Sequence, residues 1–239
     1  MTTKIRLFVK HALGKGRTVP LNVDQAHYLF SVMRQSNGNS VRLFNNVDGE
    51  WEAKITERSK RGGILECIAQ IKPLMRPRDL WLLFSPIKRS RTEFIVEKAT
   101  EMGALRIVPV RADFSKIRRV RSDRLQTLAI EATEQCGGTF VPEVSEMQPL
   151  DELLSDWPST RSIMFCDESE VGSDTRFRPI DSEAWAILIG PEGGFSVRER
   201  DRIKRMRNIH VASLGPRILR ADTAVVAAMT VWQQAAGDW

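Results

Sequence analysis

Hydrophobic and polar positions follow two different patterns along this chain, and the change comes near residue 74. Before that point, short apolar or alternating runs are separated by turn-forming residues, which is typical of strands in a small β-barrel. These runs are residues 5–9, 41–44, 51–55 and 64–71, with a hairpin turn at 45–49 and a short helix at 21–33. The first third therefore predicts a small, mostly β domain.

Beyond that point, apolar strands alternate with amphipathic helices. The predicted strands are residues 80–84, 107–110, 141–144, 161–166, 185–189 and 209–214, and the predicted helices begin near residues 90, 122, 149, 196 and 222. This alternation predicts a parallel α/β sheet. Because residues 73–79 hold two prolines and several charges, we expect a linker there, with domains at 1–73 and 74–239.

Pairs of polar residues predict where three of the helices begin. The capping-box spacing occurs at Ser90 with Glu93 and at Ser196 with Glu199. Asp222 or Thr223 is predicted to cap the last helix. One face of that helix carries small apolar side chains, at Ala224, Ala227, Ala228 and Val231. Such a face suits a tight crossing or an interface.

Two glycine-proline loops stand out near the end of the chain. Residues 190–194 (GPEGG) follow one apolar run and residues 215–216 (GP) follow the next. We interpret both runs as neighbouring buried strands, whose carboxyl ends form a ligand crevice in an open α/β sheet. The loops have neither the Lys-Ser/Thr of a P-loop nor the G-x-G-x-x-G spacing of a dinucleotide site.

The charge of the chain is unevenly divided. The net charge of the 239 residues is +6, and all of it lies in residues 1–73, which hold 12 basic and 6 acidic side chains. A basic small domain attached to a neutral larger one predicts a module that holds a polyanion, and we favour nucleic acid over a merely solvated basic face.

Other features narrow the setting. The three cysteines are far apart and the three histidines are scattered, so we expect no metal site. No apolar stretch approaches the ~20 residues of a membrane span, and the first residues do not form a signal peptide. We therefore expect a cytoplasmic protein without membrane contact.

The two glycine loops also carry a family resemblance. IGPEGGFSVRE (residues 189–199) and SLGPRILRADTA (213–224) resemble the signature of the RsmE-type ribosomal RNA methyltransferases of the SPOUT superfamily. VEKATEMG (96–103), EATEQCGG (131–138) and VMR (32–34) agree in the same order, so the resemblance covers nearly the whole chain. The chain departs from the family pattern at 221–222, where Ala-Asp replaces Thr-Glu, and at Gly138, where arginine is common.

The resemblance implies a fold and an activity. It implies a C-terminal SPOUT domain, a parallel sheet with a deep trefoil knot, and an N-terminal PUA-like RNA-binding β-barrel. It implies methyl transfer from S-adenosylmethionine to N3 of a uridine in 16S ribosomal RNA, free or in the small ribosomal subunit, by a homodimer. The alternatives are a SPOUT methyltransferase for another RNA, such as tRNA, and an RNA-binding assembly factor without catalysis.

Candidate site residues follow from the loops and strand ends. The cofactor candidates are Phe165, Asp167, Glu168, Ile189, Gly190, Pro191, Glu192, Gly193, Gly194, Leu214, Gly215, Ile218 and Leu219. Glycines let a ligand approach the backbone closely, and the three apolar residues near 214–219 offer walls to an adenine. The RNA candidates are Arg6, Arg34, Lys88, Arg89, Arg91 and Arg111, with Lys116, Arg118 and Arg119.

Three residues are candidates for catalysis. Arg220 lies at the start of a helix, where a cation is unfavourable for folding, and this points to function. N3 of uridine is a poor nucleophile until its proton leaves, after which charge spreads to the flanking carbonyls. Arg220 is predicted to stabilise that charge. Glu192, Asp222 or water is left open as the proton acceptor.

Overall fold

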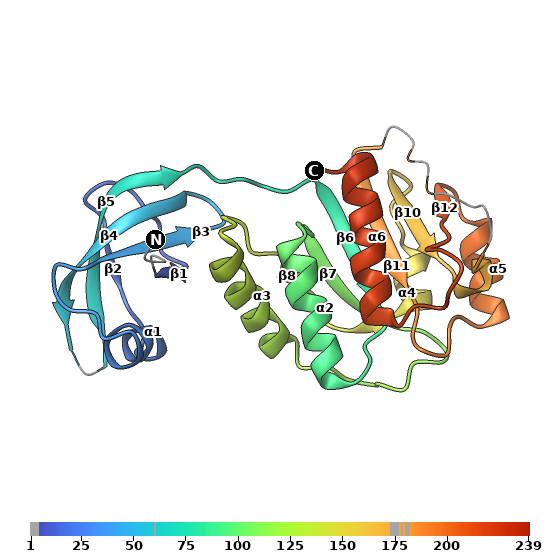
Figure 1. Cartoon of the computed structure of the whole chain (residues 1–239), viewed down its shortest axis with the longest axis horizontal. Coiled ribbons are helices and arrows are strands. Elements are labelled where there is room, and N and C mark those ends of the chain that lie inside the picture. The colour runs from blue at the N-terminus through green and yellow to red at the C-terminus, as the bar shows by residue number, and fades with distance from the viewer. Residues whose placement is uncertain (1–4, 60, 173–176, 178, 180–181) are drawn as a thin grey trace. The chain divides into compact units, whose positions relative to one another are not determined.

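The computed structural model describes residues 5–59, 61–172, 177, 179 and 182–239. The chain forms two compact units (Figure 1). One consists of Met1–Arg76 and Thr133–Val141, and the other of Pro77–Ala132 and Pro142–Trp239. The domain boundary expected near residue 74 stays a prediction, to which the units add that residues 133–141 pack with the N-terminal unit.

A five-stranded sheet forms the N-terminal unit, in the order β1-β3-β4-β5-β2. Its strands are β1 (Arg6–Phe8), β2 (Thr18–Pro20), β3 (Ser40–Asn45), β4 (Gly49–Arg58) and β5 (Gly63–Lys72). β1 runs parallel to β3 and the other neighbours are antiparallel. The mostly β domain is thus confirmed. The sequence pattern did not predict β2, because Val19 is its only buried residue.

The helix predicted at residues 21–33 has two parts. α1 (Val23–His27) begins at Asn22, which exchanges capping hydrogen bonds with Gln25. It continues as a single π-helical stretch, η1 (Tyr28–Val32). Arg34 follows with a left-handed φ of 52° and an exposed side chain.

Three basic side chains lie around one buried carboxylate inside this unit. The Glu50 carboxylate lies 3.1 Å from Arg6, 3.1 Å from Arg42 and 4.0 Å from Lys72, and its side chain is fully buried. Arg6 also donates hydrogen bonds to backbone carbonyls within residues 133–138. The structure therefore assigns Arg6 to folding rather than to the expected RNA contact, because its guanidinium is enclosed by partners of its own unit.

A parallel sheet forms the centre of the C-terminal unit, in the order β12-β10-β11-β6-β7-β8, with β9 paired to β7. Its strands are β6 (Asp79–Phe84), β7 (Arg106–Arg111), β8 (Glu143–Val144), β9 (Gln148–Pro149), β10 (Arg161–Cys166), β11 (Ala184–Ile189) and β12 (Ile209–Val211). Every pairing is parallel, which confirms the predicted α/β sheet. The knot implied by the resemblance stays a prediction.

One expectation about this sheet is wrong. The two glycine loops follow β11 and β12, which are not neighbours, because β10 lies between them. Each strand was recognisable from its own apolar residues, but their order depends on where the connections cross the sheet. Hydrophobic periodicity does not reveal that order.

Helices cover the sheet. They are α2 (Arg89–Glu101), α3 (Ser122–Cys136), α4 (Leu150–Ser155), α5 (Val197–Arg205) and α6 (Ala221–Ala236). α2 and α6 lie side by side in front of the sheet in Figure 1. Phe165, Leu188 and Ile203 belong to a core cluster that joins the sheet to α4 and α5. All six residues of β10 are buried, which explains the apolar run of residues 163–166, and the strand begins with the buried polar residues Arg161 and Ser162.

All five predicted helices of this unit begin within one residue of the expected position, and α4 follows Pro149, but the predicted caps of α2 and α6 are wrong. Ser196 and Glu199 form the predicted capping box of α5, and α3 begins at Ser122 as expected. α2 instead begins after Lys88, without a side-chain cap, and Glu93 bonds to arginine side chains. α6 begins after Arg220 rather than at Asp222 or Thr223. Among the described residues, no helix is long and apolar enough to cross a membrane.

Candidate active site

Three segments leave the sheet at one edge, after β10, β11 and β12, because these strands are parallel. β10, the middle strand, is followed by Asp167 and Glu168. The loop of residues 190–194 follows β11 on one side, and Gly215 follows β12 on the other. The carboxylates therefore lie between the two glycine loops.

Glycine in the first loop is required by close packing. A Cβ on Gly194, whose φ is +70°, would overlap the Glu168 carboxylate. A Cβ on Gly190 would lie 2.7 Å from the ring of Phe195. That ring packs edge-on against Phe165, with centroids 5.1 Å apart. The loop can thus lie directly against the end of β10 only because these positions lack side chains.

A pocket lies between the end of β10, the second loop and the start of α6, and we call it the β10–β12 pocket. It is lined by Cys166, Asp167, Glu168, Val171, Ala212, Leu214, Gly215, Arg217, Ile218, Leu219 and Ala224. Most of these side chains are apolar, yet Ile218 is 78% exposed. An apolar side chain held open beside a pocket can cover an apolar ligand surface.

The acids of this pocket are neutralised within the chain. Glu168 lies 2.7 Å from Arg200, and the buried Asp167 lies 3.2 Å from Lys204. Burial raises the pKa of Asp167, but hydrogen bonds from Ser169 and Lys204 outweigh it and hold the pKa below its ordinary value. Burial raises the pKa of the Cys166 thiol to about 12, so this wall of the pocket is uncharged.

The two candidate proton acceptors share one cation. Arg91 of α2 lies 3.6 Å from the Glu192 carboxylate and 3.7 Å from that of Asp222. Sequence reasoning placed Arg91 among RNA contacts and did not predict this bridge, since α2 and α6 are far apart along the chain. The structure thus brings Glu192 and Asp222 to a common partner.

Arg220, the third candidate for catalysis, lies at the surface. It is the residue that precedes α6, its side chain makes no cap hydrogen bond, and it is exposed. Among the described residues no ion pair to Arg220 is found. A guanidinium without a partner at the start of a helix does not stabilise the fold. This supports the choice of Arg220 as a functional candidate.

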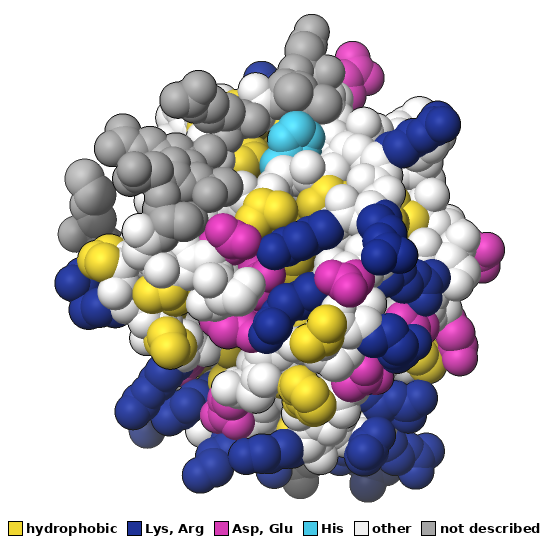
Figure 2. Space-filling view, turned by 90° about the vertical axis from the view of Figure 1, so that its right-hand side faces the viewer, with side chains coloured by type: hydrophobic (Ala, Val, Ile, Leu, Met, Phe, Trp, Pro, Cys, Tyr) yellow, Lys and Arg dark blue, Asp and Glu magenta, His cyan; other side chains and the backbone are white. Residues whose placement is uncertain are grey.

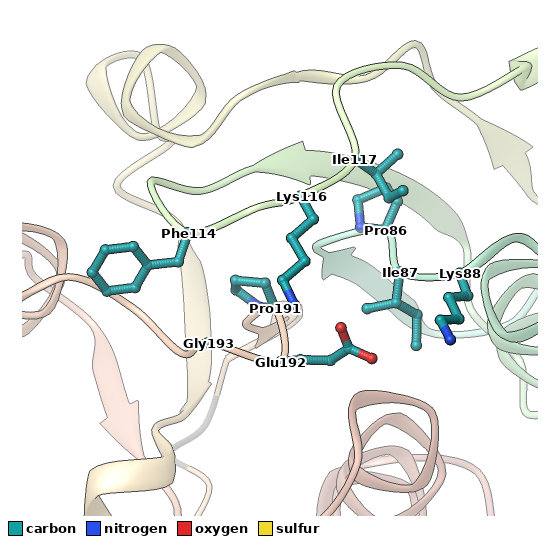
Figure 3. A pocket seen from close by; sticks show the side chains of 9 residues that line it. All are labelled: Pro86, Ile87, Lys88, Phe114, Lys116, Ile117, Pro191, Glu192 and Gly193. Atoms are coloured by element: carbon teal, nitrogen blue, oxygen red, sulfur yellow. The ribbon is translucent and has the colours of Figure 1, made fainter.

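A second pocket lies where the loops after β6, β7 and β11 meet, and we call it the β6–β7 pocket (Figure 3). It is lined by Pro86, Ile87, Lys88, Phe114, Lys116, Ile117, Pro191, Glu192 and Gly193. In Figure 3, Ile87 and Lys88 lie at one end, the Phe114 ring at the other, and Lys116 extends toward Pro191 and Glu192 between them.

The predicted cofactor residues lie partly in the β10–β12 pocket, partly in the β6–β7 pocket and partly inside strands. Asp167, Glu168, Leu214, Gly215, Ile218 and Leu219 line the β10–β12 pocket, whereas Pro191, Glu192 and Gly193 line the β6–β7 pocket. Phe165 and Ile189 are buried within their strands. Sequence reasoning missed Phe114, although a lone aromatic in the basic stretch 111–121 was a usable signal.

The basic candidates also divide. Arg89 is bound to Glu93, whereas Lys88, Arg111, Lys116, Arg118 and Arg119 are exposed and without an ion pair among the described residues. Figure 2 shows a face of the molecule where acidic and basic side chains interleave at the centre and basic ones gather along the lower rim. On α5, Arg198, Arg200, Arg202 and Lys204 are all paired with acids.

Family models match both units of this chain. The model described as an RNA methyltransferase domain matches residues 75–233, and the model of an RNA methyltransferase PUA domain matches residues 21–66. The first match covers more than half of the sequence. The chain therefore belongs to the RNA methyltransferase family, as the resemblance of its glycine motifs implied.

Particular relatives agree over nearly their full lengths. The chain is 28% identical to the ribosomal RNA small subunit methyltransferase E of Rickettsia conorii, covering 94% of this chain and 93% of the relative. Against the protein of the same name from Bacillus subtilis the identity is 26%, covering 92% and 91%. A solved structure of a ribosomal RNA small subunit methyltransferase E from Neisseria gonorrhoeae, bound to S-adenosyl methionine, has a TM-score of 0.89 at 26% identity over 99% of both chains.

Proposed function

We propose that this chain methylates N3 of a uridine in 16S ribosomal RNA of the small ribosomal subunit, with S-adenosylmethionine as methyl donor. The β10–β12 pocket carries the proposal, because an RNA methyltransferase of this fold needs a cofactor site at that sheet edge. Its relatives are named for the small-subunit RNA, and the Neisseria gonorrhoeae structure is bound to the same cofactor. The uridine and its N3 atom come from the resemblance of the glycine motifs.

The residues of the β10–β12 pocket fit this cofactor. Leu214, Ile218 and Leu219 offer apolar surface to an adenine, and backbone groups at the strand ends are available to its polar edges. Gly215 has a φ of +109° and open space where a Cβ would lie. A side chain there would enter that space and strain the backbone. Glu168 is the acid of the pocket that keeps partial exposure.

The chain itself positions the RNA and manages one proton. S-adenosylmethionine supplies an activated methyl group when it is bound. The uracil N3–H must lose its proton, and Glu192 or Asp222, both beside Arg91, is proposed to accept it. Arg220 is proposed to face the carbonyl oxygens on which negative charge develops. Because Arg220 has no acid partner among the described residues, its full charge is available to that oxyanion.

The decisive experiment is nucleoside analysis of treated RNA. The purified chain is incubated with labelled cofactor and with 16S ribosomal RNA or small subunits that lack the modification, and the digested nucleosides are examined by mass spectrometry. The proposal expects N3-methyluridine in the small-subunit RNA. Transfer RNA is the matched control, because preferential methylation of tRNA would establish the alternative substrate. Cofactor binding without transfer to either RNA would support an assembly factor.

We also propose that the enzyme works as a homodimer in the cytoplasm. The resemblance implies the dimer, and α6 presents small apolar residues, with Val231 38% exposed. Stable dimers of this kind bury on the order of 2,000 Å². Light scattering at micromolar concentration tests this, and a monomeric mass would exclude it.

A further inference from the structure

The loop after β7 displays an aromatic side chain to solvent. Phe114 is 53% exposed, although its two neighbours are fixed. On one side, the Asp113 backbone N–H donates to the buried Glu199 carboxylate, and the Asp113 carboxylate accepts a hydrogen bond of 2.6 Å from Ser196. The same hydrogen bond lowers the pKa of Asp113.

On its other side, Phe114 is followed by the buried Ser115. The Ser115 hydroxyl accepts a hydrogen bond from the Ala112 N–H and donates one to the Ser85 hydroxyl. The Ser85 N–H in turn donates to the Ile189 carbonyl, 3.1 Å away. The loops after β6 and β7 and the end of β11 are thus joined by hydrogen bonds around the β6–β7 pocket.

The first glycine loop is shaped to accept the aromatic residue. A Cβ on Gly193 would lie 3.2 Å from the Phe114 Cβ, a tighter approach than side chains usually make. A rigid ring held partly in solvent loses little conformational entropy when a ligand stacks on it.

The charges of the pocket indicate what kind of ligand it takes. Lys88 and Lys116 are exposed, line the pocket, and have no ion pair among the described residues. Arg111 at the end of β7, and Arg118 and Arg119 in the loop that follows, are also exposed without such a pair. Unpaired cations around an exposed aromatic ring form the usual surface for single-stranded nucleic acid, in which phosphates meet cations and bases stack on rings.

From these observations we propose that the β6–β7 pocket is a subsite for single-stranded RNA, in which Phe114 stacks on a base and Lys88 and Lys116 contact the flanking phosphates. This inference rests on the proposed function for the identity of the natural RNA, but its chemistry concerns any unpaired strand. Duplex RNA hides its base faces, so the ring gives the pocket a preference for unpaired nucleotides.

Binding of a short fluorescent oligouridine to the full chain tests the subsite without requiring methyl transfer. Phe114→Ala is expected to weaken binding roughly tenfold, whereas Phe114→Trp, which keeps a stacking surface, binds like the parent. The matched control is Phe94→Ala, since Phe94 is 39% exposed on α2 and outside the pocket. Thermal unfolding and cofactor binding report whether each variant is folded.

Salt dependence separates the lysines from the ring. Lys116→Gln and Lys88→Gln are each expected to reduce the slope of log affinity against log salt by about 0.7, and Phe114→Ala to leave it unchanged. Arg207→Gln, an exposed cation outside the pocket, is the control. The proposal is overturned if the parent does not bind oligouridine or if Phe94→Ala weakens binding as much as Phe114→Ala. It is also overturned if Phe114→Ala weakens the binding of a base-paired RNA as much as it weakens the binding of oligouridine. If N3-methyluridine never forms while these binding results hold, the proposed function fails and the subsite stands.

Discussion

The two pockets at the carboxyl edge of the sheet differ in which of their charged side chains are paired. In the β10–β12 pocket, Asp167 and Glu168 are neutralised by Arg200 and Lys204 of α5. In the β6–β7 pocket, the lysines have no acid partner among the described residues, while Glu192 is held by Arg91. The first suits a cofactor that binds through apolar walls and backbone, and the second suits a polyanion. The contrast concerns the acids and the lysines, because Arg217, an exposed residue of the β10–β12 pocket, also has no ion pair among the described residues.

The N-terminal unit also shows that ion pairs within the fold decide which charges are available to a ligand. Its sequence holds the whole net charge of +6, which predicted RNA binding. Arg6, Arg42 and Lys72, however, surround the buried Glu50. Fewer basic side chains of this unit are therefore available to RNA than its net charge of +6 suggests. Exposed residues such as Arg34 are better candidates for RNA contacts than Arg6.

Of the substitutions that test this comparison, those at Arg220 are expected to change the rate of methyl transfer most. Arg220→Ala should lower the rate of methyl transfer about 100-fold at saturating RNA and cofactor, because a fixed donor to the developing oxyanion is lost. Arg220→Lys should restore only part of the rate, since the charge remains but the planar guanidinium does not. Single-turnover kinetics measures both, with Arg207→Ala as the control for general charge.

Arg220 would be reassigned by a different outcome. If Arg220→Ala raises the Michaelis constant for RNA and leaves the maximal rate intact, the residue binds phosphate. It would then belong with Lys88 and Lys116 as an RNA contact, and the acids beside Arg91 would carry the chemistry without it.

The next effect concerns the backbone of the β10–β12 pocket. Gly215→Val should weaken S-adenosylmethionine binding about tenfold or more, because valine is strained at a φ of +109° and its side chain enters the pocket. Calorimetry measures the affinity. Gly38→Val is the matched control, since Gly38 has a φ of +86° and open space around it, far along the chain from either pocket. Equal loss in both variants would mean that backbone strain alone was responsible.

The sequence predicted the elements of the fold better than their arrangement. Apolar runs located β6, β10 and β11 almost to the residue, because strands buried on both faces are mostly apolar, although β6 begins with Asp79 and β10 with Arg161. The position of β10 between β11 and β12 could not be predicted, since it depends on long connections.

The site was predictable where it is local. The glycine loops and Arg220 lie within short motifs, and the structure gathers several of the predicted residues in one pocket. The Arg91 bridge to Glu192 and Asp222 joins three distant segments, so no single motif contains it. The enclosure of Arg6 likewise depends on Glu50 and on residues 133–138, which the sequence alone does not bring together.

A smaller effect is expected at Arg91, which bridges Glu192 of the β6–β7 pocket and Asp222 of α6. Arg91→Met keeps the aliphatic part of the side chain but removes the charge between Glu192 and Asp222. Partly exposed pairs contribute under about 1 kcal/mol each, so we expect an approximately threefold change in the rate of methyl transfer and little change in unfolding. Arg89→Met, which removes the pair with Glu93 on the same helix, is the control. An identical rate in both variants would show that the bridge does not position the acids.

The smallest effect tests whether the acids of the β10–β12 pocket are neutralised as described. The pKa of Asp167 is lowered in the folded protein, because hydrogen bonds from Ser169 and Lys204 exceed the opposing effect of burial. Its carboxylate therefore stabilises the fold above the unfolded pKa of about 3.9, and this contribution is lost as the pH falls through the folded value. The free energy of unfolding of Asp167→Asn should lie below that of the parent at neutral pH, and the gap should close as the pH falls below about 4. Urea unfolding at a series of pH values measures the gap, with the exposed Asp156→Asn as control. A gap that stays constant with pH would mean that Asp167 carries no lowered pKa, and the pocket would then hold an acid available to a ligand cation.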